Sequence, residues 1–181
     1  YKTKQPNWGY NGLGFVVYKR TYSRVKVDGT SEEWWETVQR CVEGAQKIGA
    51  QYTREEAESL FDKVFNLKCN FAGRMLWQLG TPMVDRFSAN SLLNCWMVTM
   101  NELCAFEFLF ENLMLGGGVG FSIRKEDVHE IPRVKEEVKI SALTTKDADF
   151  IVPDSREVWV RLLHEVLQAY FVTGKSFAYS T

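Results

Sequence analysis

The chain has 181 residues, enough to bury a substantial core as one domain or to form part of a larger one. Hydrophobic residues make up 45% and charged residues 25%, and the formal net charge of −1 lacks the basic excess typical of proteins that bind nucleic acid or anionic membranes. No apolar run approaches the ~20 residues of a membrane span, and no signal peptide is apparent. Because the chain starts at Tyr1 rather than Met, we expect its beginning to have been trimmed.

The four cysteines favour reduced thiols in a cytoplasmic protein over a metal site. No CxxC pair occurs, and only His129 and His164 could add nitrogen ligands, so zinc is poorly supported. No metal site is therefore predicted, and each thiol is judged by its own context. The cysteines are Cys41, Cys69, Cys95 and Cys104.

The first third of the chain combines a glycine-rich and aromatic stretch with a helix. Residues 7–24 read NWGYNGLGFVVYKRTYSR, whose FVVY core (15–18) is predicted to be extended. Residues 30–49 predict a helix that begins with a capping box of Thr30 and Glu33 and stops at Gly49. Its apolar residues recur at helical spacing, which makes Cys41 a small core residue: Trp34, Trp35, Val38, Cys41, Val42 and Ala45.

A second helix is predicted over residues 53–67, where Thr53 and Glu56 form another capping box. Residues 71–82 predict a helix or turn segment broken by Gly80 and Pro82. Residues 91–100, SLLNCWMVTM, follow the turn-rich DRFSAN and predict a strand. The apolar face of the second helix consists of Ala57, Leu60, Phe61, Val64 and Phe65.

The second half continues with a helix over residues 102–115, which ends at three glycines, and a strand at 119–123. The charged connection 124–139 is predicted to be solvated surface. Residues 154–174 predict a last helix, opened by Asp154 with Glu157 and closed by Gly174, before an extended end at 175–181. Its buried side is expected to carry Val158, Leu162, Val166 and Phe171.

The three consecutive glycines, Gly116, Gly117 and Gly118, lie in LMLGGGVGFSI. Phosphate loops run from strand through glycines to helix, whereas this order is helix, glycines, strand, with no following Lys-Ser/Thr. Both standard nucleotide-loop motifs are therefore rejected. A helix C-cap needs one glycine, so three indicate either a simple turn or a backbone packed against something bulky such as a ligand. Both interpretations stay open on physical grounds.

Cys95 is the second informative position, since it lies mid-strand between Asn94 and Trp96. Strand alternation places Asn94 and Trp96 on one face and Cys95 on the other. A strand cysteine is usually a buried hydrophobe, but a thiol beside an amide, one helix before a glycine turn, also suits a pocket wall. Composition alone leaves both alternatives open.

Taken in order, several segments resemble the N-terminal part of adenosylcobalamin-dependent (class II) ribonucleotide reductases. The closest likeness is to the monomeric type that reduces ribonucleoside triphosphates, and it extends from Trp8 to about Trp159. Each segment alone is weak, whereas the ordered set is specific. The segments are WGYNGLGFVVYKRTYSR, GRMLWQLGT, SLLNCWMV, FLFENLMLGGGVGFSI, IPRV and VPDSREVWV.

The resemblance implies an α/β fold in which a ten-stranded barrel surrounds a finger loop, with only its first strands present in this chain. Residues 1–79 would form a helical N-terminal region, and residues 80–181 the first part of the catalytic barrel. SLLNCWMV would be the first barrel strand, and residues 116–122 the turn into the next.

The implied reaction replaces the ribose 2′-hydroxyl by hydrogen through thiyl-radical chemistry, with adenosylcobalamin as the radical source, in deoxyribonucleotide synthesis for DNA replication. Two cysteines below the sugar supply the reducing equivalents and end as a disulfide that a thioredoxin-type reductant reopens. Cys95 aligns with the first of that pair, and the resemblance places Asn94 with the backbone of Gly116, Gly117 and Gly118 at the ribonucleotide substrate.

The family's radical cysteine, finger-loop Glu and Asn, second reducing cysteine and phosphate loop would all lie beyond Thr181, and the other three cysteines match none of these motifs. The chain alone is therefore expected to be inactive and to need a C-terminal reductase fragment or chain, which would also hold most of the cobalamin. A natural split, an intein-interrupted gene and a trimmed chain would give the same sequence. The link from Thr99 to Glu102 is shorter than in many relatives.

Two alternatives remain: a non-catalytic nucleotide-binding regulatory module derived from a reductase, and a structural or assembly subunit. Triphosphate is favoured over diphosphate as substrate by the family likeness. A deoxynucleotide effector, if bound here, is expected near residues 139–150 and the helix after Asp154. No nucleic-acid or membrane partner is expected.

Overall fold

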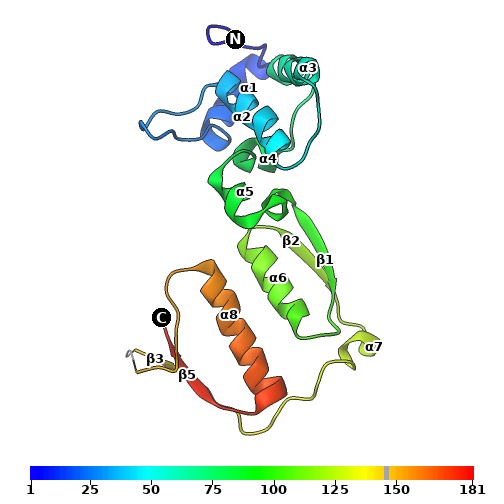
Figure 1. Cartoon of the computed structure of the whole chain (residues 1–181), viewed down its shortest axis with the longest axis vertical. Coiled ribbons are helices and arrows are strands. Elements are labelled where there is room, and N and C mark those ends of the chain that lie inside the picture. Colours follow the sequence, from blue (N-terminus) through cyan, green and yellow to red (C-terminus); the bar gives the residue numbers. More distant parts are fainter. Residues whose placement is uncertain (145–146) are drawn as a thin grey trace. The chain divides into compact units, whose positions relative to one another are not determined.

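The computed structural model describes residues 1–144 and 147–181, and it consists of helices and short parallel strands (Figure 1). The predicted α/β class is confirmed. The chain divides into two compact units, Tyr1–Leu93 and Asn94–Thr181. The helical unit thus extends beyond residue 79, because Val84 and Leu92 are buried in its core.

The first unit is entirely helical in its regular elements. Among the described residues, its order is η1 (Tyr10–Gly12), α1 (Leu13–Thr21), α2 (Trp34–Lys47), α3 (Arg54–Phe65), α4 (Gly73–Gln78), α5 (Pro82–Phe87) and η2 (Ala89–Leu92). Residues 79–81, with Gly80 at φ 74°, separate α4 from α5, and Pro82 is the first residue of α5, where its missing N–H costs nothing.

The extended FVVY prediction was wrong, because these residues lie inside helix α1. Helical geometry turns Tyr18 into the core, where its ring stacks on Trp8 at 5.4 Å and meets Trp34 edge-on at 5.1 Å. The Tyr18 hydroxyl donates to the carbonyl of Glu32 at 3.0 Å. These tertiary contacts outweigh the β preference of two adjacent valines, a preference that itself depends on context.

Helices α2 and α3 confirm the two predicted amphipathic helices, but one predicted cap was misplaced. Helix α2 begins at Trp34, so its capping box joins Glu33 and Glu36, while the Thr30 hydroxyl donates to Asp28 at 2.6 Å. At α3 the predicted box is present, because the amide of Glu56 donates to the Thr53 hydroxyl at 3.2 Å and the Thr53 amide donates to Glu56 at 2.7 Å.

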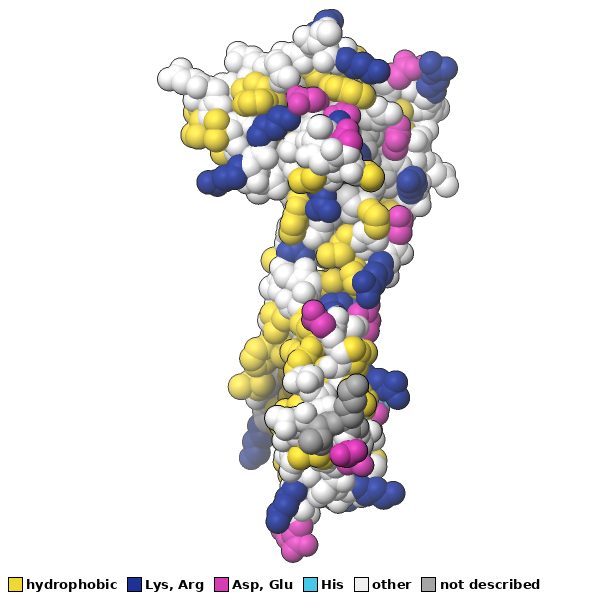
Figure 2. All heavy atoms as spheres, turned by 90° about the vertical axis from the view of Figure 1, so that its left-hand side faces the viewer, with side chains coloured by type: hydrophobic (Ala, Val, Ile, Leu, Met, Phe, Trp, Pro, Cys, Tyr) yellow, Lys and Arg dark blue, Asp and Glu magenta, His cyan; other side chains and the backbone are white. Residues whose placement is uncertain are grey.

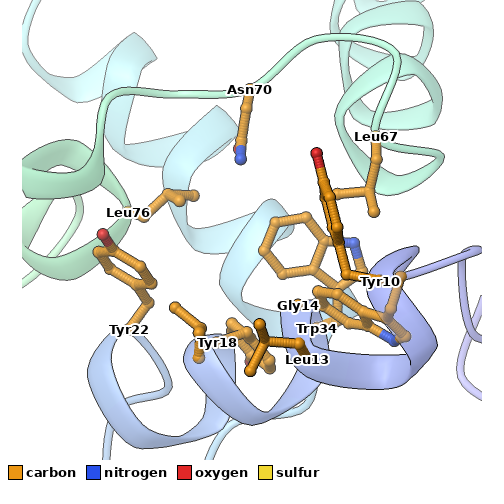
Figure 3. Close-up of a pocket in the computed structure, with 11 residues that line it drawn as sticks. Tyr10, Leu13, Gly14, Tyr18, Tyr22, Trp34, Leu67, Asn70 and Leu76 are labelled. Atoms are coloured by element: carbon orange, nitrogen blue, oxygen red, sulfur yellow. The ribbon is translucent and has the colours of Figure 1, made fainter.

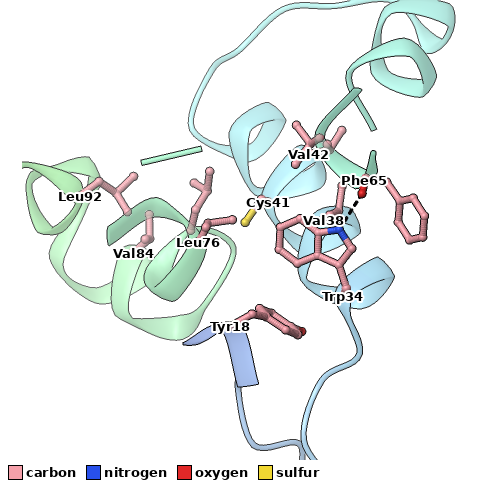
Figure 4. Close-up of a cluster of buried hydrophobic side chains, with 11 residues drawn as sticks. Tyr18, Trp34, Val38, Cys41, Val42, Phe65, Leu76, Val84 and Leu92 are labelled. Atoms are coloured by element: carbon pink, nitrogen blue, oxygen red, sulfur yellow. Dashed lines mark hydrogen bonds between the residues drawn. The ribbon is translucent and has the colours of Figure 1, made fainter. Parts of the chain in front are cut away.

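The core of this unit forms where α2 contacts α3 and α4 (Figure 4). The indole N–H of Trp34 donates to the carbonyl of Phe65 at 2.9 Å and thereby ties α2 to the end of α3. Cys41 is fully buried, and burial raises the pKa of its thiol to about 11, so its predicted role as a core residue is confirmed.

A buried ion pair links α2 to the segment before it and to α4. The Arg40 guanidinium donates from Nε to Glu32 Oε1 at 2.7 Å and from Nη2 to Oε2 at 2.9 Å. Nη2 also donates to the carbonyl of Leu76 at 2.8 Å, and Nη1 donates to that of Leu79. Burial by itself raises the pKa of Glu32, but the hydrogen bonds from Arg40 and Thr37 outweigh burial and hold this pKa below its usual value.

The second unit contains a βαβ element followed by a three-stranded parallel sheet. In the described residues the order is β1 (Cys95–Thr99), α6 (Cys104–Met114), β2 (Gly118–Ser122), α7 (Lys125–Val128), β3 (Ile140–Leu143), β4 (Phe150–Ile151), α8 (Arg156–Leu167), the π-helix η3 (Gln168–Thr173) and β5 (Phe177–Ser180). Strands β1 and β2 pair in parallel, and β5 lies between β3 and β4.

Most predicted elements of this unit are present, with differences at the edges. The last helix starts after Ser155 instead of Asp154, and it ends at Gly174 with φ 70° as predicted. Strands β3 and β4 were not anticipated. Strand β3 lies within the segment 139–150 and β4 begins at its last residue, and residues 145–146 of this expected effector region lie outside the described residues.

One ion pair and one histidine–carboxylate contact hold α8 against α6. Arg156 donates to Glu111 at 3.0 Å, and Nδ1 of His164 lies 2.8 Å from a carboxylate oxygen of Glu107. His164 therefore has a structural partner. Hydrophobic side chains nevertheless remain at the surface of both units, as Figure 2 shows for one face.

Candidate functional site

The pairing of β1 with β2 brings the sequence-predicted site residues together. Cys95 is the register partner of Gly118, and the Gly118 amide donates to the carbonyl of Asn94 at 2.8 Å. A parallel pair of this kind needs a crossover, which α6 supplies (Figure 1). Residues 94–95 and the glycines therefore form one continuous backbone surface, although α6 separates them in sequence.

The two faces of β1 differ in burial, as the alternation predicted. Trp96 and Val98 are half-buried, and the Trp96 ring meets Phe108 of α6 edge-on at 5.6 Å. Cys95 and Met97 lie on the opposite face and are exposed. The thiol of Cys95 is therefore a free, accessible group on the side of the strand pair that α6 leaves open.

Each of the three glycines has a different surrounding. Gly116 has φ 79° and its amide donates to Leu113, while the Gly117 amide donates to Asn112, each at 2.9 Å. These two bonds form a Schellman motif at the end of α6, in which the left-handed position favours glycine. Gly116 is thus explained by helix termination alone.

Packing accounts for the need for a glycine at position 117 but not at position 118. A Cβ on the buried Gly117 would lie 3.0 Å from Cδ1 and Nε1 of Trp96 and 3.1 Å from the Asn112 carbonyl oxygen. A Cβ on Gly118 would meet only the Asn94 carbonyl oxygen, at 3.7 Å, which is ordinary contact. The exposed Gly118 therefore has no steric requirement among the described residues, and it borders the same open face as Cys95.

Asn112 supports the candidate site from α6, and it was not among the residues predicted from the sequence. It is only 4% exposed, its side-chain amide donates to the Phe108 carbonyl at 2.8 Å, and its own carbonyl accepts the Gly117 amide. The signal in the sequence is a polar residue four positions before the glycines on an apolar helix. Asn112 holds the last turn of α6 and, through it, the glycine turn.

The electrostatics of the site are mild. Within residues 1–144 and 147–181, no group of three or more His, Cys, Asp and Glu could hold a metal ion. Three cavities among the described residues, of about 320, 360 and 450 Å³, are all lined by residues of the helical unit. None of the described helices is long and apolar enough to cross a membrane. What the site offers is a thiol, an amide residue and bare backbone, which suit a neutral part of a ligand.

Residues 1–81 match the family model described as ribonucleotide reductase alpha domain. The chain is 35% identical to an adenosylcobalamin-dependent ribonucleoside-triphosphate reductase of Euglena gracilis, over 94% of this chain and 25% of that protein. It is 34% identical to the enzyme of that name from Lactobacillus delbrueckii subsp. bulgaricus, over 86% of this chain and 28% of the relative. A putative reductase of Mycobacterium phage D29 is also 34% identical, over 91% and 26%.

A solved structure agrees with the sequence matches. The crystal structure of a B12-dependent (class II) ribonucleotide reductase superposes with a TM-score of 0.83 at 28% identity, covering 99% of this chain and 33% of that one. The chain therefore spans about a quarter of the length of the curated relatives and a third of the solved protein.

Proposed function

Because residues 1–81 carry the ribonucleotide reductase alpha domain and nearly the whole chain is related to adenosylcobalamin-dependent reductases, we propose that it forms the N-terminal part of such an enzyme. In this proposal, residues 94–122 are the first strand–helix–strand unit of the barrel and one wall of the ribonucleotide site. The remaining catalytic groups come from parts of the enzyme outside this sequence.

One observation carries the proposal: Gly118 is bare, exposed and sterically unconstrained beside the accessible thiol of Cys95. Where neighbouring residues do not require a glycine, its presence indicates that another molecule or segment approaches the backbone closely. A sugar lying against this backbone would have the Cys95 sulfur at its lower face, and any side chain at Gly118 would intrude on it.

In the proposed reaction Cys95 is one of two reducing thiols. The two thiols together give up two electrons and two protons and form a disulfide. The ribose 2′-carbon loses its hydroxyl as water and gains hydrogen, so each turnover consumes two thiols and releases one water. A thioredoxin-type reductant then restores the thiols by exchange through a mixed disulfide. Asn94, the residue directly before β1, is proposed to line the substrate site together with the glycine backbone.

The cofactor of the relatives supplies the radical that starts such chemistry. The described residues around Cys95 are glycines and apolar or neutral side chains, and no cluster of three or more His, Cys, Asp and Glu that could hold a metal ion is found among the described residues. They do not fit a cobalamin site, so no step of this chain is assigned to the cofactor. We propose that adenosylcobalamin binds to the other part of the enzyme.

The proposed substrate is a ribonucleoside triphosphate, because the matched relatives are named for that substrate. A deoxynucleotide effector is proposed as a further ligand of the assembled enzyme. The segment 139–150 and helix α8 are the first region to examine for it.

The test is nucleotide reduction by this chain combined, by fusion or by mixing, with the complementary C-terminal part of a reductase. With adenosylcobalamin, a nucleoside triphosphate and thioredoxin, we expect Cys95→Ser to abolish multiple turnover. Cys69→Ser and Cys104→Ser are matched controls, because both thiols are also exposed, and both variants should keep full activity.

Undiminished turnover by Cys95→Ser would contradict the assigned role of Cys95. Tight binding of nucleotide by the isolated chain, unaffected by Cys95→Ser and without activity in any combination, would support the non-catalytic regulatory module instead.

A further inference from the structure

The helical unit contains an apolar pocket of about 320 Å³ that the proposed reaction does not use (Figure 3). Aliphatic side chains of α1 and α4, Gly14, Leu67 after α3 and a single amide, Asn70, complete its lining, and no charged side chain takes part. Its aromatic residues are Trp8, Tyr10, Tyr18, Tyr22 and Trp34.

The aromatic side chains at the bottom of the pocket are held in place by ring packing and hydrogen bonds. Trp8 stacks on Tyr18 and meets Trp34 edge-on at 5.3 Å, and both Tyr18 and Trp34 are buried and hydrogen-bonded. Gly14 allows α1 to approach this cluster, because a Cβ there would lie 2.6 Å from the Trp8 carbonyl oxygen. The pocket is therefore preformed, which lowers the entropic cost of filling it.

The mouth of the pocket exposes apolar side chains on one stripe of α1. Leu13 and Val16 are 58% and 59% exposed, and Val17 follows at helical spacing. Tyr10 is 88% exposed at the rim, within a run from Gly9 to Gly12 in which every φ is positive. Left-handed backbone at a tyrosine is strained, and such strain is concentrated at functional surfaces.

Two polar features accompany this surface. The Asn70 amide, on the loop after α3, points toward the pocket in Figure 3 and has no hydrogen-bond partner among the described residues. Residues 1–27 contain six basic residues and no acidic one. Lys19 and Lys26 are paired with Glu33 and Glu36, whereas Arg20, in the last turn of α1, has no ion-pair partner in the described part of the chain.

We infer that this surface, formed by Tyr10, Leu13, Val16, Val17 and the pocket behind them, docks the part of the reductase outside this sequence. The inference rests on the proposed function. The relatives are about four times longer than this chain, and the chain covers only 33% of the solved relative, so most of such an enzyme lies outside this sequence. Exposed apolar surface next to a preformed pocket is the physical mark of such an interface.

The chemistry of the surface specifies the docking segment. An aliphatic or aromatic anchor fills the apolar pocket, the Asn70 amide pairs with a backbone amide of the segment, and an acidic residue meets Arg20. A second copy of the chain and a small aromatic ligand are the competing occupants.

A pair of matched variants tests the interface. Val16→Asp and Val27→Asp each place one acid at an exposed valine of the same unit, and Val27 is fully exposed in the turn before α2. We expect Val16→Asp to weaken association with the complementary C-terminal part at least tenfold, measured by titration calorimetry, and Val27→Asp to change it less than twofold. Unchanged circular dichroism and melting temperature of both isolated variants would show that folding is intact.

Cysteine labelling gives a second readout that does not depend on affinity. With peptide-level mass spectrometry after maleimide treatment, Val16→Cys should label readily in the isolated chain and be protected in the complex, while Val27→Cys labels in both. Equal labelling of the two in a complex that reduces nucleotides would overturn the docking surface and leave the proposed function standing. Absence of association and of activity would contradict the docking surface and the proposed function together. If protection of Val16→Cys in the isolated chain increased with concentration, the surface would bind a second copy of the chain, and docking of the rest of the reductase would be wrong.

Discussion

Gly117 and Trp96 are in direct contact: a Cβ on Gly117 would lie 3.0 Å from both Cδ1 and Nε1 of the indole ring. Trp96 is the strand neighbour of Cys95, and Gly117 is the chain neighbour of Gly118. The position of the glycine turn and that of the thiol are therefore coupled through one ring, which Phe108 supports from α6.

Substitution of the two glycines should separate structure from function. We expect Gly117→Ala to lower the free energy of unfolding by about 1–3 kcal/mol, because the methyl group collides with Trp96 and the Asn112 carbonyl. Gly118→Ala meets only ordinary contact, so its stability should stay within about 0.5 kcal/mol of wild type. Urea denaturation of the isolated chain measures both.

The same pair has a functional readout in the combined enzyme. Gly118→Ala should impair nucleotide reduction despite normal stability, since its methyl group occupies the face shared with Cys95. Normal activity of Gly118→Ala would show that no substrate lies against this backbone.

At Gly44, in the middle of α2, two effects of an alanine substitution oppose each other: a higher helix propensity and a collision with the Leu79–Gly80 backbone. Alanine would favour the helix by about 1 kcal/mol. Its Cβ, however, would lie 2.6 Å from the backbone nitrogen of Gly80, so we expect Gly44→Ala to destabilise the chain by about 2 kcal/mol. Ser59→Ala, on the exposed side of α3, should be neutral or slightly stabilising. A stabilised Gly44→Ala would contradict the close packing of α2 on the Leu79–Gly80 backbone.

The buried pair of Glu32 and Arg40 predicts acid sensitivity. The pKa of Glu32 in the folded chain lies below its ordinary value of 4.5, so the carboxylate stabilises the fold fully above that pH. The contribution is lost as the pH falls through the lower folded pKa. We expect Glu32→Gln to cost about 3 kcal/mol at pH 7 and to flatten the loss of stability below pH 4.5.

Urea titrations at pH 7 and at steps below pH 4.5 check this result. Glu58→Gln is the control, because the Arg54–Glu58 pair on α3 is exposed and contributes little to stability. Equal effects of the two substitutions at pH 7 would contradict a special role for the buried pair.

Thiol reactivity should follow the environment of each cysteine. Burial raises the pKa of Cys41 to about 11, so only about one thiol in a thousand is ionised at pH 8 and the group is also inaccessible. A thiol-specific disulfide reagent should therefore titrate three thiols of the native chain and the fourth only after unfolding. Loss of a fast-reacting thiol in Cys41→Ala would contradict the structure.

Cys104 offers a finer comparison among the exposed thiols. A hydrogen bond to the Glu102 carboxylate, with a smaller contribution from burial, raises the pKa of this thiol. Glu102→Gln should lower the pKa and increase the rate of Cys104 labelling at pH 8, while Cys69 in the same sample reacts unchanged. Peptide-level rates from mass spectrometry distinguish the two sites.

Local sequence signals were sufficient wherever neighbours in the chain decide the structure. The Thr53–Glu56 box begins α3, Gly174 ends the last helix, and the alternation in CWMVT places Trp96 and Cys95 on opposite faces. The ordered motifs also indicated the relationship to the reductases. These features follow from side-chain hydrogen bonds and periodicities of two and 3.6 residues, which a sequence displays directly.

Tertiary structure decided what depends on partners distant in the chain. FVVY is helical because Tyr18 finds Trp8 and Trp34, and Thr30 is not a cap because α2 starts further on at Trp34. The three glycines look alike in the sequence, yet one ends a helix, one avoids an indole and one is bare. The end of α6, the contact with Trp96 and the strand register that places Gly118 beside Cys95 separate them, because packing distances between segments are set by the whole fold.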